Sequence, residues 1–343
     1  MKYSRFLLIA VICCMCILGC KKNSNEGQQQ QTIRLSYANF APASTFVCVQ
    51  MERWKEEVEK RTNGKLQIDT YPGGTLLGAK DMIDGVISGQ ADIGCLCMAY
   101  QPGRFSITNA TSLPMGIPDA VVGTKVLNDI YEKYTPKGFK DVKVVTMFTN
   151  SPANIMSKRP VYTLDDIKGM NLRASGGAAK ILGTWGANYV GMPMSETPEA
   201  IQKGVVEGLF SSLEVMKDFE YAALCRYVTM TDTVIYPFAV VMNQQTWDKL
   251  PADVQKVIND LKQEQAIWTA EYMETHVKDA IEWSKLNHHI EVINLDSSEK
   301  ARFNELLKSI IDQWIIDESA KGLPAKQIVE DIDKMVTKYS QDQ

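Results

Sequence analysis

KGMNLRASGGAAKILGTWGANYVGMPMSETPEAIQKGVVEG, residues 168–208, is the stretch that decides the fold of this chain. It predicts two strand–helix alternations and a closing strand, with strands at 170–174, 188–192 and 205–210 and helices at 178–185 and 197–203. This alternation is typical of an α/β unit. The first strand carries Arg173, whose permanently charged guanidinium is a rigid fork of donors that fits a carboxylate.

Another α/β unit precedes this stretch. Strands are expected at 33–37, 65–71 and 92–98, with helices at 46–61 and 79–88 between them. The β-α-β-α-β order predicts a parallel sheet with both faces covered. A strand at 142–148 comes before the second unit, and we expect the apolar strand at 234–243 to cross back to the first.

One helical pattern is unusually long. It runs through residues 251–287, some 37 residues, against a mean of about 11–12 for helices of globular proteins. Its apolar residues recur at helical spacing: Val254, Ile258, Leu261, Trp268, Tyr272, Val277 and Ile281. At about 1.5 Å per residue the helix would exceed roughly 50 Å, so we expect it to lie across two lobes as a spine.

The length of the body, about 300 residues, is enough for two lobes with separate cores. We expect residues 32–150 with about 234–280 to form the first lobe. Residues 151–233 with about 281–343 are expected to form the second.

The N-terminus has the pattern of an export signal. Lys2 and Arg5 precede an apolar stretch of 13 residues, 6–18, which is shorter than the roughly 20 needed to span a bilayer. Its end, Ile17-Leu18-Gly19-Cys20, resembles the lipobox of bacterial lipoproteins, which implies removal of residues 1–19 and lipidation of Cys20. A polar tether up to residue 31 would follow. An ordinary signal peptide is the alternative.

Composition narrows the class of function. Loss of Lys2 and Arg5 with the signal takes the formal net charge from −4 to −6, too acidic for nucleic-acid binding. The cysteines left in the body are expected to be buried thiols, with a disulfide of Cys48 or Cys225 open: Cys48, Cys95, Cys97 and Cys225. No metal-ligand spacing, nucleophile elbow or phosphate loop is present, so neither a cofactor nor an enzyme is expected.

The chain resembles the substrate-binding proteins of tripartite ATP-independent periplasmic (TRAP) transporters, of the DctP type. The matching motifs cover nearly all of the mature chain in order: Tyr71-Pro72 with Leu77-Gly78, Gly89-Gln90-Ala91-Asp92-Ile93, Leu113-Pro114, Leu164 to Gly169 leading to Leu172-Arg173, Gly186-Ala187, Met192-Pro193, Glu196, Gln202 to Gly208, Asn243, Trp247 and Leu250-Pro251. The resemblance implies two α/β lobes that close on a ligand and delivery of that ligand to a membrane permease. It also implies that Arg173 pairs with the ligand carboxylate.

Departures from the family pattern bear on the ligand. Ala153 stands where relatives that bind sialic acids have a second arginine, and Ser211 lies near the position where some 2-oxoacid binders hold a metal. These differences argue against a large acidic sugar and against a bound cation. We expect a small monocarboxylate with an apolar or aromatic tail. The predicted pocket surrounds Arg173 with Asn39, Phe40, Cys97, Tyr100, Met194, Phe210 and Ser211.

Tyr100 and Arg104 are candidates for a second polar contact with the ligand, Arg104 being expected in solvent. Two other classes remain beside a TRAP receptor. The Arg173–Gly208 pattern discriminates against a binding subunit of an ATP-driven importer. A lipid-anchored sensor or scaffold that signals to a membrane receptor is not excluded by the sequence.

Overall fold

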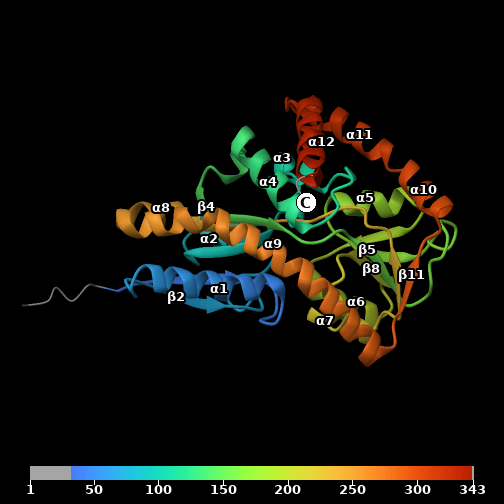
Figure 1. Cartoon of the computed structure of the whole chain (residues 1–343), viewed down its shortest axis with the longest axis horizontal. Coiled ribbons are helices and arrows are strands. Elements are labelled where there is room, and N and C mark those ends of the chain that lie inside the picture. The colour runs from blue at the N-terminus through green and yellow to red at the C-terminus, as the bar shows by residue number, and fades with distance from the viewer. Residues whose placement is uncertain (1–31, 342–343) are drawn as a thin grey trace, which may run out of the picture. The chain divides into compact units, whose positions relative to one another are not determined.

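The computed structural model describes residues 32–341, which form an α/β structure built on two sheets (Figure 1). The predicted signal, the lipidation at Cys20 and the tether lie outside the described residues. Within residues 32–341 no helix is long and apolar enough to cross a membrane.

The first sheet contains the strands expected early in the chain. Across the sheet the order is β2 (Leu66–Tyr71), β1 (Ile33–Asn39), β3 (Ile93–Cys97), β10 (Pro237–Asn243) and β4 (Val142–Thr149). The predicted parallel pairing holds for β1 with β2 and with β3. β10 returns from the second half of the chain, as expected, and runs antiparallel to both β3 and β4.

The helices of this first lobe cover the faces and ends of its sheet. They are α1 (Phe46–Arg61), α2 (Met82–Ile87), α3 (Ser106–Asn109), α4 (Ala120–Tyr134) and α8 (Gln244–Lys249), with short 3-10 turns η1 (Met98–Tyr100), η2 (Ala110–Ser112) and η3 (Lys137–Phe139). The Asp119 carboxylate caps the N-terminus of α4 by accepting a hydrogen bond from the Val122 N–H at 2.8 Å.

The second lobe has a mixed sheet. Its order is β11 (Glu291–Asn294), β9 (Tyr227–Met230), β5 (Asn154–Ser157), β8 (Gly208–Ser211), β6 (Asn171–Ala174) and β7 (Asn188–Gly191). β6 is parallel to β7 and β8, as the strand–helix alternation predicts, whereas β5 is antiparallel to β8 and β9. A Cβ on Gly208 would lie 2.1 Å from the Met156 carbonyl oxygen, so only glycine fits where β8 pairs with β5.

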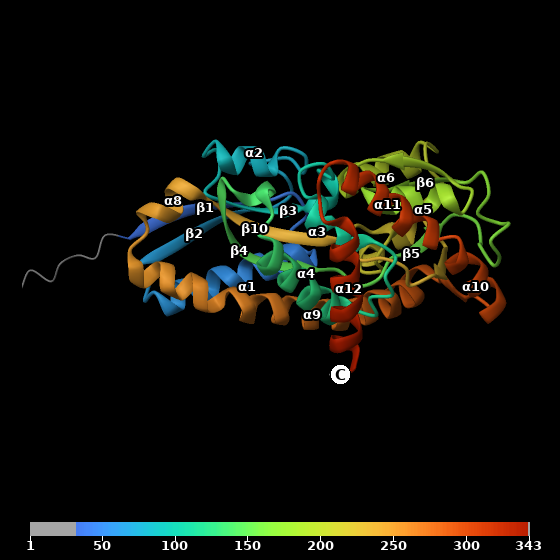
Figure 2. The same ribbon diagram turned by 90° about the horizontal axis from the view of Figure 1, so that it is seen from above.

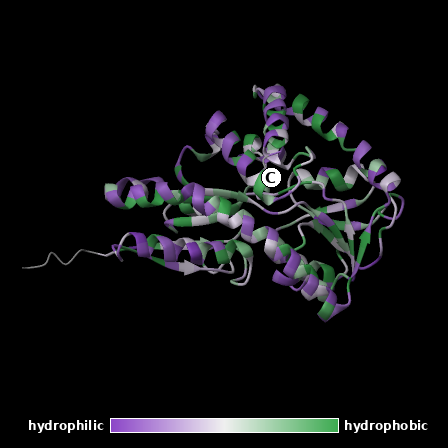
Figure 3. Cartoon of the chain, viewed as in Figure 1, coloured by the Kyte–Doolittle hydropathy of each residue, from purple (hydrophilic) through white to green (hydrophobic). Residues whose placement is uncertain are grey.

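Short helices connect these strands. They are α5 (Gly177–Thr184), α6 (Thr197–Gln202) and α7 (Val215–Asp218), with the 3-10 turns η4 (Met194–Glu196) and η5 (Tyr221–Ala223). Figure 3 shows hydrophobic residues gathered on the strands of this sheet and hydrophilic residues on much of the outer helices.

The predicted long helix is present as α9 (Ala252–His288), with 37 residues. Both views show it running from the first lobe to the second (Figures 1 and 2). It packs on α1, α4 and β4 of the first lobe and on α7 of the second. Gln265 of α9 donates to the Gln50 carbonyl of the first lobe at 2.9 Å. His276 of the same helix is hydrogen-bonded to Asp218 of the second lobe, so α9 is fixed to both lobes.

The C-terminal helices are α10 (Ser297–Glu305), α11 (Lys308–Ala320) and α12 (Ala325–Gln341). α12 packs on α4, where Asp331 pairs with Lys133 at 2.6 Å and accepts from the Tyr134 hydroxyl. The expected placement of 281–343 in the second lobe therefore needs a correction at its end, because the buried face of α12 lies on the first lobe. The other lobe boundaries stay a prediction.

Candidate ligand-binding site

Arg173 lies on β6 and is 1% exposed, unusually deep for a guanidinium. Its Nε and Nη2 both donate to the Met192 carbonyl, at 3.0 and 2.8 Å, and Nη2 also donates to the Ser175 hydroxyl at 2.7 Å. These bonds hold one edge of the fork in place. No hydrogen bond between described residues uses Nη1.

Arg173 has no carboxylate partner among the described residues. A charge taken out of water and left unpaired is costly, and buried charges in proteins are paired as a rule. The guanidinium lines a cavity whose empty space is about 470 Å³, part of it open to solvent. It is therefore placed to receive an anion that enters this cavity.

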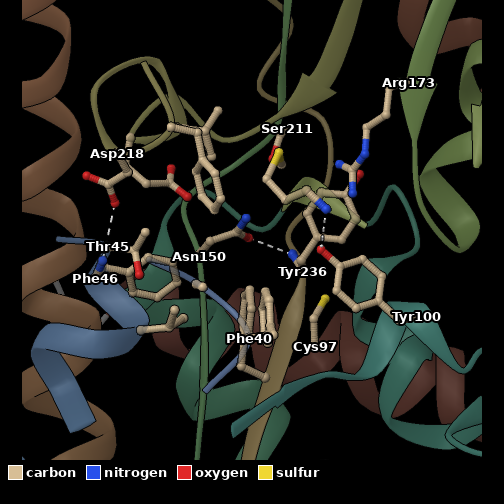
Figure 4. A pocket seen from close by; sticks show the side chains of 17 residues that line it. Phe40, Thr45, Phe46, Cys97, Tyr100, Asn150, Arg173, Ser211, Asp218 and Tyr236 are labelled. Atoms are coloured by element: carbon tan, nitrogen blue, oxygen red, sulfur yellow. Dashed lines mark hydrogen bonds between the residues drawn. The ribbon is translucent and has the colours of Figure 1, made fainter. Parts of the chain in front are cut away.

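Tyr100 lies beside the guanidinium, at the end of η1 (Figure 4). Its hydroxyl accepts from the Met194 N–H at 3.1 Å, a hydrogen bond between the two lobes. Burial raises the pKa of Tyr100 to about 12, although the Arg173 charge lowers it. The phenol therefore keeps its proton at neutral pH and can donate it toward the cavity.

Six of the eight residues predicted for the pocket line this cavity together: Phe40, Cys97, Tyr100, Arg173, Met194 and Ser211. They come from both lobes, so the site forms where the lobes meet. The Cys97 thiol stays protonated, because burial raises its pKa to about 12. All four cysteines of the described chain are buried free thiols, which settles the open disulfide question.

Asn39 and Phe210 do not line the cavity. Asn39 is fully buried behind it, donating to the Val47 carbonyl at 2.8 Å and accepting from the Ala41 N–H at 3.2 Å, so it shapes the loop that carries Phe40. Phe210 packs edge-on against Trp185, with ring centroids 5.4 Å apart. Neighbouring residues of a strand point to opposite faces, so Phe210 and Ser211 of β8 cannot both face the ligand.

Arg104 also lies outside the cavity lining, as the sequence suggested. Its Nη1 pairs with Asp84 at 2.6 Å on the surface of the first lobe. Of the two candidates for a second polar contact, only Tyr100 reaches the cavity.

Several lining residues are not predicted from the sequence: Ala41, Thr45, Phe46, Val47, Asn150, Glu214, Val215, Asp218, Phe219, Tyr236 and Phe238. Asn150 and Tyr236 lie on the two segments that cross between the lobes, and the Asn150 side-chain oxygen accepts from the Tyr236 N–H at 2.6 Å. The polar run Asn150-Ser151 directly after the apolar strand β4 was a signal for this crossing.

An acidic cluster closes the other end of the cavity. Asp218 of α7 pairs with His276 at 2.7 Å through Oδ1, and its Oδ2 accepts from the Phe46 N–H at 3.2 Å. Glu214 lines the same end and is 3% exposed. Burial and the nearby Asp218 charge raise the pKa of Glu214 to about 8, so this carboxyl is mainly protonated at neutral pH.

No group of three or more histidine, cysteine, aspartate or glutamate side chains within residues 32–341 is arranged to hold a metal ion. The chemistry that the site offers is recognition: a fixed guanidinium, neutral donors and a mostly apolar wall.

The comparisons with known proteins agree with this geometry. The family model "Bacterial extracellular solute-binding protein, family 7" (DctP) matches residues 37–317. The chain belongs to this family, whose members are extracytoplasmic solute receptors for transport and not enzymes.

A TRAP periplasmic solute-binding protein from Desulfovibrio salexigens is 52% identical and superposes with a TM-score of 0.80 over 90% of this chain and 96% of its own. Its structure is an open complex with the C-terminus of a symmetry mate in the ligand-binding site. The chain is thus a TRAP solute-binding protein with the two-lobe fold of that class.

Two more distant relatives agree. A marine metagenome TRAP protein specific for aromatic acid ligands, in complex with 3-hydroxybenzoate, is 25% identical and has a TM-score of 0.86 over 90% of this chain and 99% of its own. A solute-binding protein of Verminephrobacter eiseniae is 26% identical over 83% of this chain and 85% of its own length.

Proposed function

We propose that this protein captures a small organic carboxylate on Arg173, in the cavity between its lobes, and delivers it to a TRAP membrane permease. The observation that carries the proposal is a 1% exposed guanidinium that faces a cavity and has no carboxylate partner among the described residues. A ligand carboxylate supplies the missing charge.

Energetics favour this pairing. A hydrogen bond to a charged group contributes about 1.5–3 kcal/mol, and Nη1 is the guanidinium nitrogen that the bonds to Met192 and Ser175 leave for a ligand carboxylate. The contacts with Met192 and Ser175 fix the guanidinium before the ligand arrives, so little side-chain entropy is lost on binding.

The rest of the lining favours a monocarboxylate with an apolar or aromatic tail. Aromatic and sulfur-containing side chains make up much of the cavity wall: Phe40, Phe46, Cys97, Met194 and Phe238. The relatives support the class of ligand, since one holds the C-terminus of another chain in its binding site and another holds an aromatic acid.

The place of action follows from the N-terminal motif. We propose that Cys20 carries the lipid and that the polar residues after it tether the receptor to the membrane beside its permease.

A thermal-shift screen tests the proposal. The protein from Lys22 onward is unfolded and refolded to remove any carried-over ligand, then mixed with benzoate, phenylacetate, pyruvate and succinate. At about one hundred times its dissociation constant a ligand adds roughly 2.7 kcal/mol of stability. We expect an aromatic monocarboxylate to stabilise the wild type and the Arg104→Ala control but not Arg173→Ala. Equal shifts in Arg173→Ala, or no shift with any acid, would overturn the proposal.

A further inference from the structure

The cavity has two chemically different ends. Figure 4 shows Arg173 and Tyr100 on one side and Asp218 with Thr45 and Phe46 on the other, with Ser211 and Tyr236 between them. The arginine end is accounted for by a ligand carboxylate. The acidic end takes no part in binding that carboxylate, although its residues line the same cavity.

Glu214 carries an unsatisfied atom at this end. Only 3% of the surface of Glu214 is exposed, and its Oε2 has no hydrogen-bond partner among the described residues. Leaving a buried polar atom unpaired costs about 1–3 kcal/mol. Since Glu214 lines the cavity, a ligand atom can make the missing bond.

Asp218 is not free for this role. Its Oδ1 meets His276 at 2.7 Å and its Oδ2 accepts from the Phe46 N–H at 3.2 Å, so both oxygens are used inside the protein. The negative charge of Asp218 also favours the neutral form of Glu214. A neutral carboxyl both donates and accepts, which matches a hydroxyl group.

We propose that Glu214 is a second, specificity-determining contact, which binds a hydroxyl group at the end of the ligand remote from its carboxylate. This inference rests on the proposed function, because Arg173 fixes the other end. The substrate class is then a monocarboxylic acid with an apolar body and a distal hydroxyl. A second carboxylate is disfavoured there because Asp218 would repel it.

The apolar neighbours of Glu214 increase the difference in binding between ligands with and without the hydroxyl group. Phe46 lies beside Asp218, and Val215 and Phe219, which follow Glu214 and Asp218 in the sequence, also line the cavity. None of these three side chains can form a hydrogen bond. A ligand without the hydroxyl therefore gains apolar contact but leaves Glu214 Oε2 unpaired. One hydrogen bond gained there corresponds to about a tenfold change in affinity.

Titration calorimetry with matched acids tests the inference. The probes are benzoate and phenylacetate, their 2-, 3- and 4-hydroxy derivatives, 3-aminomethylbenzoate and isophthalate, titrated into refolded protein from Lys22 onward. We expect at least one hydroxy acid to bind about tenfold tighter than its parent. Glu214→Leu should remove this advantage, so that the hydroxy acid and its parent bind the variant with dissociation constants within about threefold of each other.

Glu214→Gln, which can still donate and accept, should keep part of the advantage, and the exposed control Glu199→Leu all of it. Parent acids that bind through Arg173 with no gain from any hydroxyl would overturn this inference and leave the proposed function standing. A hydroxyl gain that survives in Glu214→Leu, or tightest binding of the ammonium or dicarboxylate probe, would also overturn it. No binding of any acid would instead contradict the proposed function itself.

Discussion

The Asp218 carboxylate of α7 accepts a hydrogen bond of 3.2 Å from the backbone N–H of Phe46, the first residue of α1. This bond joins the second lobe to the first beside the cavity. Negative charge at the N-terminus of a helix is favourable, because the first N–H groups have no partner within the helix. His276 of the long helix meets the same carboxylate at 2.7 Å, so three elements come together at Asp218.

The Asp218–His276 pair predicts how readily the His276 ring is protonated. Burial lowers the pKa of His276, but the hydrogen bond and charge of Asp218 outweigh it, and the net pKa is raised above 6.5. Replacing Asp218 by asparagine should lower the pKa of His276 by about a unit or more. NMR titration of the histidine ring protons measures this, with the exposed His289 as internal control. An unchanged His276 in Asp218→Asn would contradict the pairing.

The buried Glu214 carboxyl predicts a stability change with pH. Its folded-state pKa is about 8 against an ordinary value of 4.5, mainly through burial. Between these values the folded protein keeps a proton that the unfolded chain has lost. The free energy of unfolding should therefore fall by about 1.4 kcal/mol per pH unit as pH rises between these two values. The stabilising contribution of the Glu214 proton is complete below pH 4.5 and is lost as pH rises through 8.

Urea unfolding of the wild type and Glu214→Gln at pH 5, 6, 7 and 8 tests this prediction. Glutamine cannot ionise, so the difference in unfolding free energy between the two proteins should change steadily over this range. A constant difference would show that Glu214 titrates in the folded protein as it does in the unfolded chain.

Tyr100 should support both the lobe interface and the ligand. Tyr100→Phe leaves the Met194 N–H without its acceptor and removes a donor beside Arg173. We expect the affinity for a bound carboxylate to fall about tenfold or more. Calorimetry gives the dissociation constants, with Tyr71→Phe, whose residue is 39% exposed, as the matched control. Equal affinities of Tyr100→Phe and the control would exclude this role.

The packing of α12 on the first lobe predicts a stability effect far from the site. Ile332 of α12 is fully buried, so Ile332→Ala should cost about 2–4 kcal/mol through lost burial and the cavity left behind. Lys334→Ala, at an exposed position of the same helix, should have little effect. Midpoints of urea unfolding measure both, and an effect of Ile332→Ala as small as that of Lys334→Ala would show that α12 does not contribute to the core.

Much of the architecture was predictable because periodicity was strong. The pattern at 46–61 matches α1 at both ends, and the pattern at 251–287 matches α9 within one residue. The strands β5, β9 and β11 are not predicted from the sequence. Each has four residues, as β6, β7 and β8 do, but none belongs to a strand–helix alternation that would reveal so short a strand. The lobe contacted by α12 depends on tertiary packing, which no local pattern encodes.

The site was predictable on the arginine side and not on the acidic side. Arg173 lies in a motif of the family resemblance, and Met194 lies between the motif residues Pro193 and Glu196. Asp218 ends α7, a helix of four residues, and Glu214 directly precedes that helix, so in the sequence their charges look like those of an ordinary solvated turn. Their burial arises only when α1 and α9 pack against them.

The carboxylate on Arg173 is the central claim, and a double-mutant cycle tests it most directly. The dissociation constants of a bound acid, for example benzoate, and its uncharged carboxamide are measured for the wild type and Arg173→Met. We expect the wild type to prefer the acid by about tenfold or more and Arg173→Met to reduce the preference to less than about threefold, because a charge-assisted hydrogen bond to the carboxylate is lost. A preference for the acid that survives in Arg173→Met would contradict the account.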